Sequence, residues 1–145
     1  MTGNKPDTGC VFCDAPRPPS PDSLIVFERK TCYVILNLYP YISGHLLIVP
    51  NDHVGELDAT RKEVTDELMD LSKRCQTALR EVYRPGGFNL GMNLGRSAGA
   101  GIVDHIHLHI LPRWTGDSNF MSSVGETRVI PEDLTVTYGK LRAKF

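Results

Sequence analysis

The sequence predicts an α+β domain in which one long helix packs on an antiparallel β-sheet. Two neighbouring apolar runs predict a β-hairpin, a long amphipathic segment predicts the helix, and the expected order of elements is β-β-β-α-β-β. A length of 145 residues fits a single domain, and no internal repeat is present. We therefore expect one domain over residues 1–145, with an irregular N-terminal strap (residues 1–23) and a C-terminal specificity tail (residues 115–145).

The first strands are expected after the strap, because its many prolines break regular elements. Residues 24–28 and 32–38 are apolar and rich in β-formers, and the three polar residues between them predict a hairpin. A turn over residues 39–44 then leads into a buried strand over residues 45–50, which Pro50 ends.

The long helix is expected over residues 60–84. Thr60 and Glu63 have the spacing of a capping box, which predicts its start, and Pro85 with the two following glycines predicts its end. Its apolar stripe recurs at three- and four-residue steps: Val64, Leu68, Leu71, Cys75, Leu79 and Val82.

The second half of the chain is expected to hold two strands and a short helix. Residues 88–93 alternate like a strand and run into a loop of small residues, 95–101. A strong strand is expected over residues 105–111, closed by Pro112. The residues from Pro131 to Asp133 predict the start of a second helix, because proline suits a first helical turn.

Composition excludes some classes of function. The formal net charge is −1 and no long basic run is present, which argues against a general nucleic-acid binder but allows a small nucleotide as ligand. No apolar run is long enough for a membrane span, and the first residues lack the pattern of a signal peptide. We therefore expect a cytoplasmic protein with no membrane partner, in which Cys32 and Cys75 belong to the core.

Three histidines alternate along the last expected strand. Alternate side chains of a strand share a face, so His105, His107 and His109 should line one face while the isoleucines and leucine between them enter the core. Such a face suits metal binding or nucleophilic catalysis, and a polar face without chemistry is the remaining alternative. The upstream loop 95–101 favours nucleophilic catalysis on a phosphate, since small residues let backbone N–H groups approach an anion.

The run HIHLHIL (residues 105–111) matches the motif His-φ-His-φ-His-φ-φ at every position. Upstream, residues 35–37 and 44–50 look like the ribose strand and the Gly-His strand that accompany this motif. From Cys10 to about Trp114, the chain resembles the histidine-triad (HIT) family. The resemblance implies a HIT-like fold, a nucleotide substrate and a covalent nucleotidyl-histidine intermediate.

The resemblance also implies roles for individual residues. His107 looks like the nucleophile, His109 like the ring that binds non-bridging phosphate oxygens, and His45 like the buried histidine that supports the triad. Asn37 matches a position that holds the ribose hydroxyls, although a turn residue at the strand end is an alternative, and Asn93 matches a position near the phosphates.

The phosphate loop departs from the family pattern. Many members carry Gln or a hydroxyl residue at the positions of Gly101 and Ile102, and the loop appears one residue longer here. The contact with the leaving oxygen is therefore left to backbone amides or to Ser97, and the expected nucleotide contacts in this loop are Ser97, Gly99, Ala100 and Gly101.

Cys10 and Cys13 form a Cys-x-x-Cys pair, which suits a redox pair, half of a zinc site or packed thiols. The pair lacks the strand-to-helix context of a thioredoxin-type redox site. The resemblance to zinc-containing histidine-triad proteins and to galactose-1-phosphate uridylyltransferases implies a structural zinc held by Cys10, Cys13, His53 and His105, with no organic cofactor.

The segment after the triad resembles a branch that includes diadenosine tetraphosphate phosphorylases. This resemblance implies a dinucleoside polyphosphate substrate, and we predict phosphate as the acceptor, with Trp114 stacking on a base or shielding the intermediate. Alternatives are a nucleoside phosphoramidase, a nucleotide-binding sensor or partner module, and a metal-dependent hydrolase. The resemblance further implies a homodimer that pairs through the long helix and the strand over residues 88–93.

Overall fold

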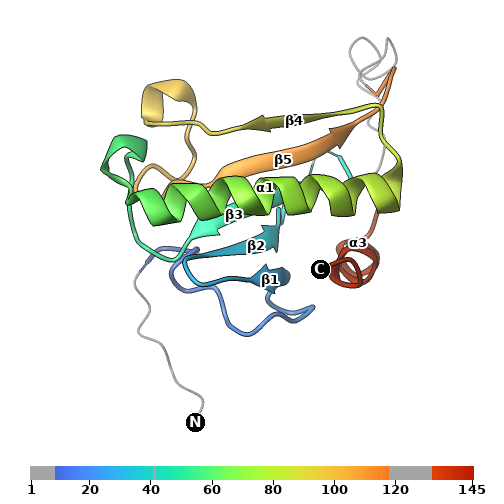
Figure 1. Ribbon diagram of the computed structural model, residues 1–145, viewed down its shortest axis with the longest axis horizontal. Helices are drawn as coiled ribbons and strands as arrows, with labels where there is room; N and C mark the ends of the chain where they lie inside the picture. Colours follow the sequence, from blue (N-terminus) through green and yellow to red (C-terminus); the bar gives the residue numbers. More distant parts are fainter. Residues whose placement is uncertain (1–8, 41, 118–131) are drawn as a thin grey trace.

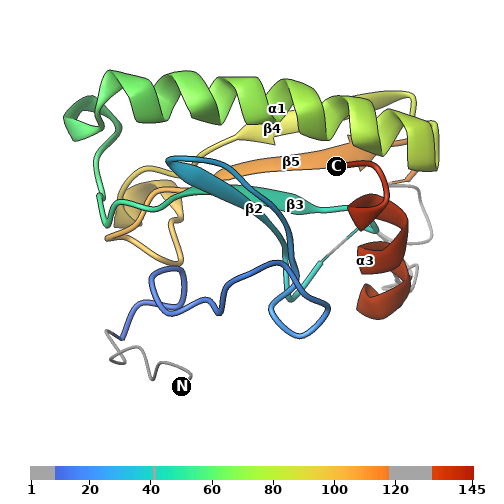
Figure 2. The ribbon, with the colours of Figure 1, turned by 60° about the horizontal axis from the view of Figure 1, so that its bottom comes forward.

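The computed structural model describes residues 9–40, 42–117 and 132–145. It confirms the predicted α+β fold: a five-stranded antiparallel sheet in the order β1-β2-β3-β5-β4 carries the long helix α1 on one face (Figure 1). The N-terminal strap runs beneath the other face, and α3 closes one end (Figure 2). The elements are β1 (Ile25–Glu28), β2 (Cys32–Leu36), β3 (Leu46–Pro50), η1 (Leu57–Ala59), α1 (Lys62–Tyr83), β4 (Gly87–Gly91), η2 (Arg96–Ala98), β5 (Leu108–Arg113) and α3 (Leu134–Arg142).

Alternation along the central strands builds two cores, one on each face of the sheet. The helix-side core takes every second residue of β2, β3 and β5 and packs them against α1 and α3: among them Val34, Leu36, Leu46, Ile48, Leu108, Ile110, Leu79 and Leu141. The strap-side core takes the intervening residues and packs them against the strap: Tyr33, Leu47, Val49, Phe12 and Ala15. The expected core positions of Cys32 and Cys75 are confirmed, since both side chains are buried.

The strap is part of the packed structure and not only a surface segment. Phe12 and Ala15 are buried against the sheet. The hydroxyl of Tyr33 donates to the backbone oxygen of Phe12 at 2.7 Å, and the guanidinium of Arg17 lies 3.8 Å from the centre of the Tyr33 ring. Arg17 also pairs with Glu28 of β1. These contacts fix the Cys-x-x-Cys pair relative to the sheet.

The predicted capping box of the long helix is wrong. The residue before the helix is Arg61, and it makes no side-chain capping hydrogen bond. The hydroxyl of Thr60 donates instead to the backbone oxygen of Glu56 in the preceding η1 turn, and Glu63 pairs with Arg61. The hydroxyl of Thr60 is therefore engaged in the neighbouring turn and does not cap the helix. At the other end the helix stops at Tyr83, where Arg84 turns left-handed with φ of 47°.

The last strand begins later than predicted, at Leu108 and not at His105. Its partner β3 ends at Pro50, and the pairing of Ile48 with Leu108 is the last one in the ladder. Proline has no N–H to extend that ladder. The backbone N–H of Ile106 donates instead to the oxygen of Val54 at 2.8 Å. His105 and His107 therefore lie on a segment attached to residues 51–55, just before the strand.

The remaining strands and the second helix begin or end a few residues away from their predicted positions. The strand expected over residues 32–38 ends at Leu36, and the one expected over residues 88–93 spans Gly87–Gly91. The second helix is Leu134–Arg142, capped by Asp133, whose side chain accepts from the N–H of Thr135; Pro131 lies outside the described residues. Among the helices of the described ranges, none is both long and apolar enough to cross a bilayer.

Candidate active site

Four of the five histidines form a series on the strap side of the sheet, and Phe12 packs into the middle of it. The rings of His45 and His109 lie 5.1 Å apart between centres, and those of His109 and His107 lie 4.9 Å apart. Phe12 contacts His107 at 4.8 Å and His105 at 5.4 Å. We call His45, His109 and His107 the histidine row. The sequence-predicted triad and its fourth histidine are therefore brought together by the fold.

His107 has one nitrogen fixed and the other left for chemistry. Its Nδ1 lies 3.1 Å from the backbone oxygen of His105. A carbonyl oxygen only accepts, so Nδ1 carries the proton and Nε2 holds the lone pair. Burial lowers the pKa of His107 below its ordinary value, which keeps the ring neutral near pH 7. A neutral imidazole with a free Nε2 lone pair is a competent nucleophile.

His45 and His109 are joined directly, and Asn37 holds the other side of His45. Nε2 of His45 lies 2.9 Å from Nδ1 of His109, and Nδ1 of His45 lies 3.1 Å from Nδ2 of Asn37. The register explains the arrangement: His109 pairs with Leu47 in β3, two residues after His45. Burial, and after it the rings of His109 and His107, lowers the pKa of His45 to about 4. Burial also lowers the pKa of His109, so the whole row is neutral at neutral pH.

Cys10, Cys13, His53 and His105 form a second cluster beyond Phe12. Their ligand atoms all lie within 4.8 Å of one another. The sulfur of Cys13 lies 3.3 Å from Nδ1 of His53 and 3.5 Å from Nδ1 of His105, and the sulfur of Cys10 lies 3.4 Å from the same Nδ1 of His105. A turn in which the N–H of Asp14 donates to the oxygen of Cys10 brings the two thiols together. This Cys2His2 cluster has the composition of a metal site.

His105 is oriented for that cluster by its other nitrogen. Its Nε2 lies 2.8 Å from the backbone oxygen of Pro50, so Nε2 carries the proton and Nδ1 presents a lone pair to the thiols. An outer N–H given to a backbone carbonyl is the usual support of a metal-binding histidine. His105 is fully buried, and burial lowers its pKa, which favours the neutral form that a metal requires.

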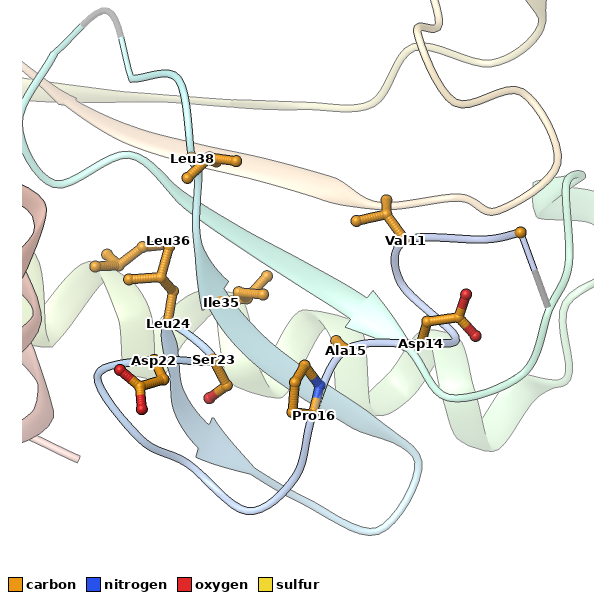
Figure 3. Close-up of a pocket in the computed structure, with 11 residues that line it drawn as sticks. Val11, Asp14, Ala15, Pro16, Asp22, Ser23, Leu24, Ile35, Leu36 and Leu38 are labelled. Atoms are coloured by element: carbon orange, nitrogen blue, oxygen red, sulfur yellow. The ribbon is translucent and has the colours of Figure 1, made fainter. Parts of the chain in front are cut away.

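An open groove of about 690 Å³ is lined by residues of the strap and of β2 (Figure 3). Figure 3 shows the strap on one side of the groove and the end of β2 on the other. The groove adjoins two residues that contact the row. Val11 precedes Phe12, whose ring packs on His107, and Leu36 and Leu38 flank Asn37, whose amide contacts His45. Val11 and Leu38 leave 62% and 55% of their surface exposed, which provides apolar area for a flat ligand. The lining is Gly9, Val11, Asp14, Ala15, Pro16, Asp22, Ser23, Leu24, Ile35, Leu36 and Leu38.

The expected phosphate loop starts level with the histidine row. Gly91 pairs with His109, so Asn93 and the loop continue along the sheet edge in the direction of His107. Part of the loop's donor capacity is used internally: the N–H groups of Ala98 and Ala100 donate to Gly95, and that of Gly99 donates to Arg96. Ser97 and Gly101 are exposed, and their contact with a nucleotide stays a prediction.

Trp114 is not brought together with the histidine row. It follows the far end of β5, roughly 20 Å from His107 along the strand at 3.3 Å per residue. Its indole N–H donates to the backbone oxygen of Tyr83 at the end of α1, and the two rings meet edge to face. Its expected role at the base or over the intermediate stays a prediction. Residues 118–131 of the expected specificity tail lie outside the described residues.

Sequence reasoning missed Phe12, Tyr33 and the groove. Phe12 lies between the two cysteines, and its large apolar side chain could have indicated that this segment is buried. Its contact with His105 and His107 required the strap to fold under the sheet, which no local pattern predicts.

The site combines a neutral imidazole with an available lone pair, a neighbouring imidazole and an adjacent groove. Comparison with known proteins extends this description. The HIT domain family matches residues 19–116. An AP-4-A phosphorylase of Mycobacterium tuberculosis is 41% identical over 126 residues, covering 87% of this chain and 65% of that protein. Adenylylsulfatase HINT3 of Arabidopsis thaliana is 35% identical over 104 residues, covering 72% of this chain and 52% of that protein.

A solved structure agrees with these sequence matches. The crystal structure of a Zn-bound histidine triad family protein from Mycobacterium smegmatis superposes with a TM-score of 0.73 at 31% identity, covering 93% of this chain and 91% of that chain. The chain therefore belongs to the histidine-triad family, as its HIHLHIL run indicated. It spans about 65% of the length of the phosphorylase that it matches.

Proposed function

We propose that the protein cleaves a dinucleoside polyphosphate through a covalent nucleotidyl-histidine intermediate on His107. One observation carries the proposal: the proton on Nδ1 of His107 is held by the oxygen of His105, so the lone pair of Nε2 is available for attack. In the first step Nε2 of His107 attacks the α-phosphorus, a P–N bond forms, and the anhydride bond to the β-phosphate breaks. The leaving polyphosphate takes the bonding electron pair.

The groove and Asn37 support a role in holding the nucleoside. The exposed apolar side chains of Val11 and Leu38 suit contact with the faces of a base. The carboxylates of Asp14 and Asp22 can accept hydrogen bonds from amino or hydroxyl groups. Asn37 lies between groove and histidine row, which is where a ribose would join the base to the α-phosphate. Asn93, Ser97, Gly99, Ala100 and Gly101 stay proposed contacts of the phosphates.

We further propose that inorganic phosphate is the preferred acceptor of the nucleotidyl group. The support is the 41% identity to an AP-4-A phosphorylase. In this second step a phosphate oxygen attacks the phosphorus of the adduct, the P–N bond breaks, and His107 recovers its lone pair. Diadenosine tetraphosphate would then yield ATP in the first step and ADP in the second.

The proposal is tested with diadenosine tetraphosphate in the presence and absence of phosphate. We expect ATP and ADP at millimolar phosphate, ATP and AMP in its absence, and an AMP mass on His107 in acid-free quenched protein. An unchanged ratio of ADP to AMP on adding phosphate would leave a hydrolase. A fully active His107→Ala protein would refute the covalent mechanism altogether.

We propose that zinc occupies the Cys2His2 cluster, with Cys10, Cys13, His53 and His105 as ligands. In tetrahedral zinc sites, sulfur and nitrogen ligands are separated by about 3.5 Å, given Zn–S of about 2.3 Å and Zn–N of about 2.0 Å. The three sulfur–nitrogen distances, 3.3 Å, 3.4 Å and 3.5 Å, fit that geometry. Four protein ligands leave no open position, so the ion would be structural and would tie the strap to the active segment. Thiolate ligands suit the reducing cytoplasm.

We propose that the protein works as a homodimer paired along β4. This strand is an edge of the sheet, and Leu90 near its C-terminal end leaves 49% of its surface exposed. Unpaired edges that expose apolar side chains tend to recruit another strand. Light scattering should give twice the chain mass of 16.1 kDa, and Leu90→Lys should return the mass to one chain. A monomeric wild-type protein at micromolar concentration would contradict the dimer.

A further inference from the structure

Asn37 has both ends of its side-chain amide engaged, and this fixes the orientation of the amide. Its Oδ1 accepts from the backbone N–H of Tyr39 at 3.4 Å, and its Nδ2 lies 3.1 Å from Nδ1 of His45. A backbone N–H can only donate, so the amide oxygen must face Tyr39. The opposite orientation would place two donors against each other. The amide NH2 of Asn37 therefore donates to His45.

The orientation of Asn37 sets the protons of the next two rings. Nδ1 of His45 accepts, so the single proton of this neutral ring sits on Nε2. That N–H donates to Nδ1 of His109 at 2.9 Å, which leaves the proton of His109 on its Nε2. The reverse pattern would require an N–H of His45 to face the NH2 of Asn37.

We propose that Asn37 is a positioning residue that keeps Nε2 of His109 as a hydrogen-bond donor for the reacting phosphate. The inference rests on the proposed function for the use of that donor, but the proton pattern itself exists without ligand. It gives Asn37 a task separate from contact with a ribose, because the NH2 group that sets the pattern faces His45 and not the groove ligand. A donor aimed at a developing oxyanion contributes about 100- to 1000-fold to turnover in other enzymes.

Replacement of Asn37 by Asp tests this role with little change in shape. A carboxylate only accepts, so Nδ1 of His45 must then carry a proton. At low pH, His45 takes a second proton and still donates to His109. At higher pH, His45 keeps only the Nδ1 proton, so its Nε2 accepts a hydrogen bond from Nδ1 of His109. The single proton of His109 then lies on Nδ1, and its Nε2 is no longer a donor. The titratable groups that face His45 among the described residues are His109 and His107, with Tyr83 of α1 packed on the adjacent Gly44.

We therefore expect N37D to acquire an alkaline loss of kcat of about 100-fold that the wild type does not show. A merely structural effect would lower kcat by the same factor at every pH. Exposed Asn51 provides the matched control. Its amide oxygen accepts from Arg17, as a carboxylate can, and the hydrogen bond that N51D loses, from its NH2 to the oxygen of Lys30, is exposed. N51D should keep the wild-type pH profile. Parallel profiles of N37D and wild type would overturn the proposal.

Nitrogen NMR of histidine-labelled, substrate-free protein tests the proton pattern directly. In the wild type, His45 and His109 should both carry the proton on Nε2, whereas His45 of N37D should carry one on Nδ1. A wild-type His45 protonated on Nδ1 would overturn the proposal even if N37D failed to fold. This measurement needs no turnover: the expected pattern in a protein without nucleotide activity would refute the proposed function and leave the positioning role of Asn37 supported.

Discussion

The two ends of the histidine series have the same residue type and opposite chemistry. At the cluster end, the Nε2–H of His105 donates to the backbone oxygen of Pro50, and its Nδ1 lone pair faces two thiols. In the histidine row, the Nδ1–H of His107 donates to the backbone oxygen of His105 and its Nε2 keeps the lone pair. Nδ1 of His109 accepts a hydrogen bond from His45. The difference teaches that the neighbour of one ring nitrogen decides what the other nitrogen can do.

The two ends are also held by different means. The cluster end lies on a segment outside the sheet, is held by the strap and by Val54, and would also be held by the proposed zinc. Within the row, His109 is held by the pairing of β5 with β3 and His45 by Asn37, whereas His107 directly precedes β5. Substitutions at the two ends should therefore separate loss of chemistry from loss of structure.

The largest effect is expected for His107→Ala, which removes the proposed nucleophile and leaves the cluster intact. We expect kcat to fall by at least about 1000-fold, as for removal of other covalent nucleophiles, while nucleotide binding stays measurable. Zinc content by elemental analysis should match the wild type and serves as the control for folding. Loss of zinc together with activity would show that the two ends are not separable.

Cys13→Ala should have the converse effect, because Cys13 contacts both histidines of the cluster. We expect loss of bound zinc and a melting temperature lower by roughly 5–10 °C, since metal binding contributes to folding. Activity should decline less than in His107→Ala. Cys75→Ala is the control, because this buried thiol lies in the helix-side core, apart from the cluster. Full zinc retention in Cys13→Ala would contradict the ligand assignment.

His45→Gln should flatten the acid side of the stability profile. The pKa of His45 is about 4 in the folded protein and about 6.5 in an unfolded chain. Above pH 6.5 both states are neutral; between pH 6.5 and 4 only the unfolded chain takes the proton, so stability falls as the pH falls. The loss approaches about 1.4 kcal/mol per pH unit for this group. Urea unfolding at pH 5 and 7 should show a smaller difference in His45→Gln than in wild type; equal differences would contradict a neutral buried His45.

The smallest effect is expected for Phe12→Leu, which alters the contact between the two ends. Phe12 touches the rings of His105 and His107, and such aromatic contacts contribute about 0.5–1.5 kcal/mol. We expect kcat to fall by roughly threefold to tenfold with zinc retained. Val11→Ala, in the groove and outside this contact, should raise KM for the nucleotide and leave kcat nearly unchanged. A change in KM alone for Phe12→Leu would assign Phe12 to the groove.

Local sequence predicted the elements better than their ends. The apolar stripe of α1 and the alternation around His107 predicted the helix, the sheet and the face that the histidines share. Thr60 and Glu63 matched a capping box, but a neighbouring turn and Arg61 took both side chains. The histidine strand was predicted from His105, but its partner strand ends at Pro50 and the ladder stops. The exact ends of the elements depend on competing hydrogen-bond partners. These partners either lie far away in the sequence or form no recognisable sequence pattern.

The sequence by itself determined which residue types were available: alternating histidines, two spaced thiols and a strand pattern that sends the histidines to the face opposite the helix. The tertiary structure alone decided how each ring is used. His105 meets Pro50 across 55 positions and the thiols across more than 90, and His45 meets His109 across 64. A hydrogen bond fixes a proton only when donor and acceptor are in contact, and folding alone brings groups so far apart in the chain into contact.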